Sequence, residues 1–248
     1  MTWQEECALL ARLETFDPAA FRESDDVPQA VCNFVLALAV IYNDFKDAIY
    51  AHVVLGSAKP DGSLRRTRAW GANVGAQGHV QRAILGMIHE LLRLIEKSQA
   101  QIEHPTFASV VQRLNSSART AWQALAAAGT GRESDALSKR LVRFRNSVAF
   151  HYEPNAFGVG YDHHFFGSTK ADDRAFVSRG TTLRESRFYF ADAAATGYLL
   201  AVVGREHIDE MVAEVVDTVE RINLALFTIV EAFIQRRRFA FRSHTEDA

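Results

Sequence analysis

An arginine and a histidine lie near the end of one helical pattern, at Arg145 and His151. On an ideal helix Arg145 lies about 60° to one side of Val148 and His151 about 60° to the other, with about 9 Å between them along the axis. A guanidinium is long enough to lean along that face, so both groups can line one groove. Imidazole, with an ordinary pKa of about 6.5, exchanges protons near neutral pH, and guanidinium holds phosphate through two hydrogen bonds. The pair therefore has the chemistry that phosphodiester cleavage needs.

Other polar residues can assist this pair. Asn146 directly follows Arg145, where it could donate a hydrogen bond to a phosphate or orient a partner. Asp44 and Asp47 are three residues apart on a different predicted helix, so they share a face from which they could hold the arginine or the imidazole of His151. We therefore expect these residues to support the Arg145–His151 pair.

Structural roles explain the same residues equally simply. His151 lies on the apolar stripe of its helix with Phe144 and Val148, where a hydrogen-bonded core histidine is ordinary. A histidine at a helix C-terminus is also stabilised by the helix dipole. Arg145 could form an interhelical salt bridge with one of the two aspartates. Both the catalytic and the structural interpretation remain open from the residues alone.

The segment resembles the signature of the HEPN superfamily (higher eukaryotes and prokaryotes nucleotide-binding), an Arg followed by four to six residues and a His, often with Asn after the Arg. Arg145, Asn146 and His151 match that pattern directly within residues 133–155. The resemblance extends more weakly to 27–54. The short segments at 42–47 and 149–154 are similar to segments of bacterial HEPN-like proteins. In the toxin branch one residue separates His and Tyr, whereas here Tyr follows His151 at once.

The resemblance implies an activity, because catalytic HEPN members are metal-independent ribonucleases that act without a cofactor. It implies an endoribonuclease of bacterial toxin or defence type, with RNA or a nucleotide as ligand, a homodimer with a composite cleft, and a cognate antitoxin as partner. The alternative is a non-catalytic helical module that binds a nucleotide, RNA or another protein. The implied catalytic residues are Arg145 and His151, and the supporting residues are Asn146, Tyr152, Asp44 and Asp47.

The hydrophobic periodicity predicts an all-α, antiparallel helical bundle in a single domain over residues 1–248. We expect a helical core over about 27–152 and 191–236, and an insertion over about 155–190 with a small β-hairpin around 174–190. The glycine-rich residues 56–78 are expected to form a long exposed connection. The predicted helices cover 27–54, 80–98, 105–131, 134–153, 191–203 and 206–236.

The last predicted helix carries apolar residues at alternating steps of four and three, which we call the 208–233 seam. Such a repeat packs inside a bundle or against a second subunit. The 208–233 seam is therefore a candidate dimer surface. Its members are residues 208, 212, 215, 219, 222, 226, 229 and 233.

Composition limits the classes of protein that remain. With 28 Lys and Arg against 30 Asp and Glu, the net charge of −2 excludes a strongly basic nucleic-acid coat. Cys7 and Cys32 are too few for a disulfide framework, so a reducing cytoplasm is expected. The most apolar stretch, 34–42, is far shorter than the roughly 20 residues of a membrane-spanning helix. His89 and Glu90 begin an HExxH zinc motif whose second histidine is replaced by arginine, so no metal site is expected.

Overall fold

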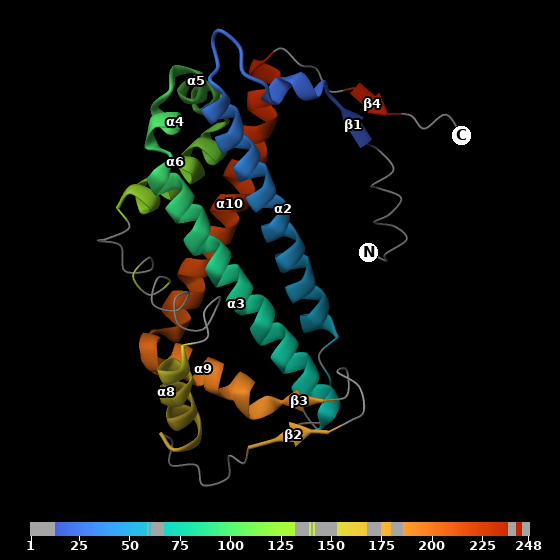
Figure 1. Cartoon of the computed structure of the whole chain (residues 1–248), viewed down its shortest axis with the longest axis vertical. Coiled ribbons are helices and arrows are strands. Elements are labelled where there is room, and N and C mark those ends of the chain that lie inside the picture. The colour runs from blue at the N-terminus through green and yellow to red at the C-terminus, as the bar shows by residue number, and fades with distance from the viewer. Residues whose placement is uncertain are drawn as a thin grey trace.

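The computed structural model describes residues 13–58, 60, 67–131, 139, 141, 153–167, 175–179, 186–237 and 242–244. These residues form long helices with two short strand pairs, as Figure 1 shows. The predicted all-α bundle with a small β-hairpin is confirmed. The elements are β1 (Leu13–Thr15), the 3-10 turn η1 (Pro18–Phe21), α2 (Gln29–Ser57), α3 (Arg68–Lys97), α4 (Gln99–Glu103), α5 (Pro105–Arg113), α6 (Ser116–Thr130), α8 (Pro154–Phe165), β2 (Val177–Ser178), β3 (Arg187–Phe188), α9 (Tyr189–Val203), the 3-10 turn η4 (Arg205–His207), α10 (Ile208–Arg236) and β4 (Arg242–His244).

The hydrophobic core lies where α2, α3, α6 and α10 pack together (Figure 1). α2 runs antiparallel to both α3 and α10, so the chain crosses the length of the bundle three times in these helices. Phe34, Phe107 and Trp122 come from three different helices and meet edge to face, with ring centroids 5.3 to 6.5 Å apart. Aromatic contacts of this geometry add to the energy of burial alone. No helix in the described part of the chain is both long enough and apolar enough to cross a bilayer.

α2 agrees with the predicted helix 27–54 except at its ends. It begins after Pro28, and no side chain, that of Asp26 included, forms a capping hydrogen bond to it. The Asp26 backbone carbonyl instead accepts a hydrogen bond of 3.0 Å from the hydroxyl of Thr106 at the start of α5. This contact joins the entry of α2 to a distant part of the chain.

α3 begins twelve residues earlier than the predicted helix 80–98, because Thr67 caps it through a hydrogen bond to the Trp70 backbone nitrogen. The prediction that 56–78 is one long exposed connection is therefore wrong over its second half. Glycines at 71, 75 and 78 suggested a loop, since glycine is a poor helix former. Tertiary contacts explain two of them. A methyl group at Gly71 would overlap the Tyr189 ring, and one at Gly75 would overlap the Arg187 guanidinium.

Those two side chains attach the β2–β3 hairpin to α3. The Tyr189 hydroxyl lies 3.3 Å from the Arg68 carbonyl and 3.2 Å from the Ser178 hydroxyl. Arg187 Nε donates to Asp192 at 2.8 Å while its guanidinium rests on Gly75. The hairpin pairs antiparallel as predicted, but it is short, because α9 begins directly after β3.

The predicted loss of helical structure from 155 to 190 is wrong at its beginning. Residues 154–165 form α8, with a proline in its first turn. α8 and α9 pack closely because glycines face each other where they cross. A methyl group at Gly160 would overlap the Ala194 carbonyl, and one at Gly197 would overlap the Gly160 carbonyl. Its glycine content hid this helix from the periodicity analysis.

The predicted helix 105–131 is two helices, α5 and α6, separated at Leu114 and Asn115. Asn115 caps α6 by accepting a hydrogen bond of 2.8 Å from the Ala118 backbone nitrogen. A second difference is the pairing of β1 with β4, which joins the two ends of the described chain antiparallel and which no sequence pattern predicted. The predicted helix 134–153 lies outside the described residues, apart from Lys139, Leu141 and Glu153.

α10 confirms the predicted long final helix and corrects the role of the 208–233 seam. Ile222, Leu226, Ile229 and Phe233 are at most 1% exposed and belong to the core of the chain itself. This half of the seam cannot be a dimer surface. In the other half, Val212 is 51% exposed.

Candidate functional site

The structure describes two of the six sequence-predicted site residues. Arg145, Asn146, His151 and Tyr152 lie outside the described residues. Asp44 and Asp47 lie one turn apart on α2.

Both aspartates are on the exposed side of α2. Phe45, which lies between them in sequence, is 3% exposed and points into the core, and the carboxylates project away from it. The Asp47 carboxylate is 3.4 Å from the ammonium group of Lys46, in a well-solvated ion pair. Such exposed pairs contribute little to stability. Asp44 makes no ion pair with another described residue. Asp44 is exposed, so its carboxylate faces outward rather than into the four-helix core.

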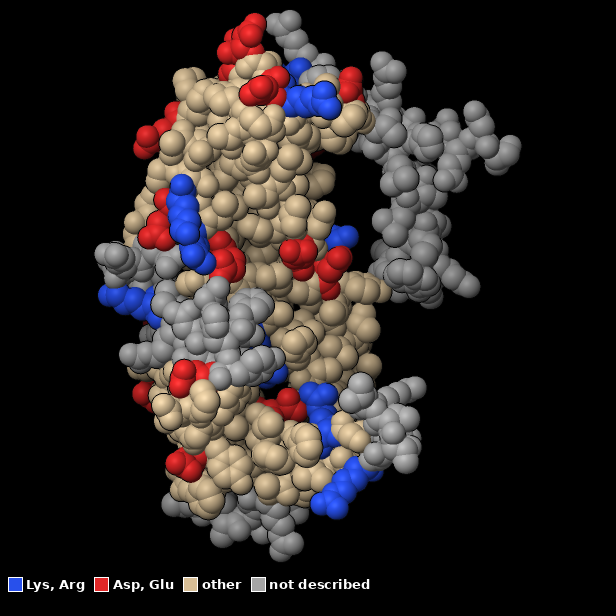
Figure 2. Space-filling view, in the orientation of Figure 1, with Lys and Arg blue, Asp and Glu red and all other residues tan. Residues whose placement is uncertain are grey.

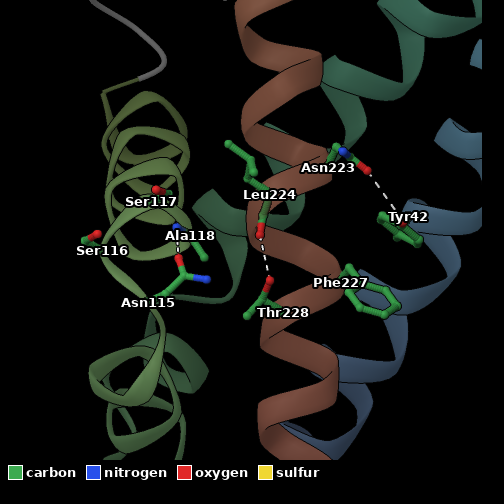
Figure 3. A pocket seen from close by; sticks show the side chains of 9 residues that line it. All are labelled: Tyr42, Asn115, Ser116, Ser117, Ala118, Asn223, Leu224, Phe227 and Thr228. Carbon is green, nitrogen blue, oxygen red and sulfur yellow. Dashed lines mark hydrogen bonds between the residues drawn. The ribbon is translucent and has the colours of Figure 1, made fainter.

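A pocket of about 460 Å³ lies between α2, α6 and α10 (Figure 3), and neither aspartate lines it. The Phe227 ring is 55% exposed and contacts the Tyr42 ring, with centroids 5.8 Å apart. The Tyr42 hydroxyl lies 3.5 Å from the Asn223 side-chain oxygen. Across the pocket is the first turn of α6. The residues lining the pocket are Tyr42, Asn115, Ser116, Ser117, Ala118, Asn223, Leu224, Phe227 and Thr228.

The chemistry of this pocket favours binding over acid–base catalysis. Its described lining contains amides, hydroxyls and aromatic rings but no carboxylate, imidazole or ammonium group. Some of its polar groups are already used, since Asn115 caps α6 and the Thr228 hydroxyl donates to the Leu224 carbonyl at 2.9 Å. The remaining amide and hydroxyl groups can hydrogen-bond a ligand without exchanging protons near neutral pH.

A second, narrower groove of about 270 Å³ continues from this pocket along the junction of α2 and α10. Tyr42 and Asn223 belong to both. The floor of the groove is apolar, and Lys46 and Glu220 are its only charged described lining residues. We call it the α2–α10 groove. Its other lining residues are Phe45, Ile49, Val219 and Ile222.

Charge is mixed over the surface. On the face drawn in Figure 2, Lys and Arg side chains are scattered among Asp and Glu and form no continuous basic patch in the described part of the molecule. No group of three or more His, Cys, Asp or Glu side chains among the described residues could hold a metal ion. Burial raises the pKa of the Cys32 thiol, although Arg237 opposes the shift. Cys32 is fully buried, so it is a core residue rather than a nucleophile.

No family model matches the chain, and no curated protein or solved structure matches it at a significant level.

None of the residues that line the described pocket is among the six sequence-predicted site residues. Asn115 was placed inside one continuous helix, although Asn followed by Ser-Ser is a typical helix start. Asn223 and Phe227 lie between members of the 208–233 seam, and only the folded structure shows that they face a groove. Tyr42 belongs to the segment 42–47, but nothing in that segment indicates that Tyr42 contacts a residue on α10.

Proposed function

We propose that the chain is a metal-independent endoribonuclease of bacterial toxin or defence type. The observation that carries the proposal is the placement of Arg145, Asn146 and His151 in the HEPN-like pattern. The all-α bundle supports it, because it is the class of fold that the resemblance implies.

The proposed reaction is attack of a ribose 2′-oxygen on the adjacent phosphorus. One bond forms between that oxygen and phosphorus, and the bond to the leaving 5′-oxygen breaks. His151 takes the proton from the 2′-hydroxyl or gives one to the 5′-oxygen, and an imidazole can do either near neutral pH. Arg145 stabilises the negative charge that collects on the phosphorus oxygens in the transition state. The products are a 2′,3′-cyclic phosphate and a free 5′-hydroxyl.

Asn146, Tyr152, Asp44 and Asp47 are proposed as supporting residues. The outward direction of the two carboxylates on α2 leaves them accessible to a group that approaches from outside the four-helix core. A homodimer would bring two copies of the motif into one cleft, and a cognate antitoxin would block it. RNA or a nucleotide is the proposed ligand.

The experiment incubates the purified full chain with labelled RNA in excess EDTA. We expect cleavage that leaves 2′,3′-cyclic phosphate ends, and a loss of about 10²-fold to 10⁴-fold in rate for His151→Ala. Arg145→Lys keeps the charge but loses two-point phosphate binding, so it should also be slow. His207→Ala is the matched control, because His207 is 50% exposed at its side chain and lies before α10. Equal cleavage by wild type and His151→Ala would refute the proposal.

The alternative is a binding module without turnover. The α2–α6–α10 pocket favours it, because its described lining holds hydrogen-bonding and stacking groups but no group that exchanges protons at neutral pH. In that case RNA or a nucleotide should bind without cleavage, and salt should weaken the complex. Phe227→Ser, which removes the exposed ring from the pocket, should weaken it as well.

A further inference from the structure

α2 and α10 present apolar side chains to solvent along their common outer side. On α10 the exposed apolar residues Val212, Val216 and Phe227 lie on one stripe of the helix. The polar Glu220 and Asn223 complete that stripe, at steps of four, four, three and four. On α2 the exposed apolar residues lie opposite the buried residues of that helix. We call this surface the α2–α10 outer face. Its large apolar residues, each 45% to 58% exposed, are Val40, Tyr50, Val54, Val212, Val216 and Phe227.

The two stripes belong to one surface. α2 and α10 are antiparallel neighbours, and the Tyr42–Phe227 ring contact joins them at the middle of α2. The α2–α10 groove runs between them, with a volume of about 270 Å³ and an apolar floor. A groove of this size can accept one or two side chains of a helix laid across it. From Val212 to Phe227 the stripe is about 22 Å long, which matches a partner helix of about 15 residues.

Carboxylates are interleaved with these apolar residues. α10 carries six Asp or Glu residues against two Arg. Glu220 lies within the stripe and lines the groove, and Asp44 and Asp47 lie on the outer side of α2. Neither Asp44 nor Glu220 forms an ion pair with another residue in the described part of the chain. Lys46 also lines the groove and pairs with Asp47, so these three carboxylates face one ammonium group. The outer face is therefore apolar and, on balance, acidic.

We propose that the α2–α10 outer face binds a cationic amphipathic helix of a partner protein. Its apolar side chains would enter the groove, and its lysines or arginines would pair with the carboxylates. A second copy of this chain fits less well, because a two-fold interface sets the same surface against itself and would bring these carboxylates together. RNA fits poorly because its phosphates carry the same sign of charge. The proposal does not depend on ribonuclease activity.

The test uses the full chain and a fluorescein-labelled synthetic peptide of about 15 residues, with Leu at helical spacing i, i+3, i+4 and i+7 and Lys elsewhere. Binding is followed by fluorescence anisotropy at about 0.1 M and about 0.5 M salt. A peptide of the same composition, scrambled so that Leu surrounds the helix, is the control. We expect the amphipathic peptide to bind more tightly, and less tightly at the higher salt.

Two matched substitutions locate the site. Val216→Ser should weaken binding about tenfold, whereas Val159→Ser on α8 should leave it unchanged. The two valines have nearly equal exposed fractions, 52% and 51%. Glu220→Lys should weaken binding further at low salt. Because all three residues are exposed, the melting temperatures should remain close to that of the wild type.

Any of four results would overturn the proposal. Equal binding of the two peptides, or equal effects of Val216→Ser and Val159→Ser, would show that the outer face is not the site. A dimer in sedimentation that Val216→Ser dissociates would assign the face to a second copy. Displacement of the peptide by RNA, with the same sensitivity to Val216→Ser, would assign it to nucleic acid.

Discussion

The crossing of α8 and α9 allows a sharp test of the packing. In α8, a methyl group at Gly160 would overlap the Ala194 carbonyl oxygen and lie 2.6 Å from the Tyr198 backbone nitrogen, where ordinary contact begins at 3.4 Å. These are backbone atoms, so the helices themselves must move apart. A methyl group at Gly158, two residues earlier, would meet nothing within 4 Å. The two glycines share a helix and differ only in what lies beside them.

Gly→Ala at these positions should therefore have effects of opposite sign. Helix propensity favours alanine by about 1 kcal/mol at both. At Gly160, overpacking costs about 3 kcal/mol, so the net loss of stability is about 2 kcal/mol. Gly158→Ala should gain about 1 kcal/mol. The difference of about 3 kcal/mol corresponds to about 6 to 12 °C in melting temperature for a chain of this size.

The assay is urea and thermal unfolding of both variants, followed by far-ultraviolet circular dichroism. The dependence of unfolding free energy on urea should match the wild type, so that midpoints can be compared directly. If Gly160→Ala is as stabilising as Gly158→Ala, the helices do not approach through glycine, and the α8–α9 packing described above is wrong.

Two further predictions concern α3 and the core. Gly71→Ala should lower the melting temperature because the Tyr189 ring must leave its place. Gly78→Ala in the same helix should raise the melting temperature, since its methyl group would meet only Arg82 Nη1 at 3.7 Å. Equal shifts would contradict the docking of the hairpin on α3. Burial raises the pKa of the Cys32 thiol in the folded state above its ordinary value of 9.0. Above pH 9.0 unfolding therefore releases a proton, and the free energy of unfolding falls as pH rises through the higher folded pKa. The unfolding midpoint of wild type relative to Cys32→Ser should thus decline above about pH 9, and a constant difference would argue against a desolvated thiol.

Periodicity predicted the long helices because each has one face in the core. α2 and α10 alternate buried and exposed residues over 29 residues each, and such patterns are hard to produce by chance. Hydrophobic periodicity did not predict a helix where glycines stand in place of the apolar residues of the pattern. α3 near its start and α8 contain glycines, at Gly71 and Gly160, where a neighbouring residue packs too closely to leave room for a side chain. A tertiary contact of this kind leaves no local pattern in one sequence.

The candidate site was likewise predictable only in part from the sequence. Spacing alone selected Arg145, His151, Asp44 and Asp47, and the structure adds that both aspartates point outward from α2. The pocket and the α2–α10 groove could not be predicted, because Tyr42 and Asn223 are 181 residues apart and meet only when α2 and α10 pack. Helix faces could be assigned from the sequence, but the pairing of the helices could not.

Asp44 and Asp47 connect the two proposals and constrain both. A carboxylate beside the scissile phosphate would repel it, so either aspartate can support cleavage only if a cation such as Arg145 neutralises it. A neutralised carboxylate would in turn contribute little to the attraction of a cationic helix. Glu220 is on the other helix and lines the groove, so it can attract such a helix whatever the aspartates do. For this reason Glu220, rather than Asp44 or Asp47, is the residue whose substitution separates binding at the outer face from chemistry at the Arg145–His151 motif.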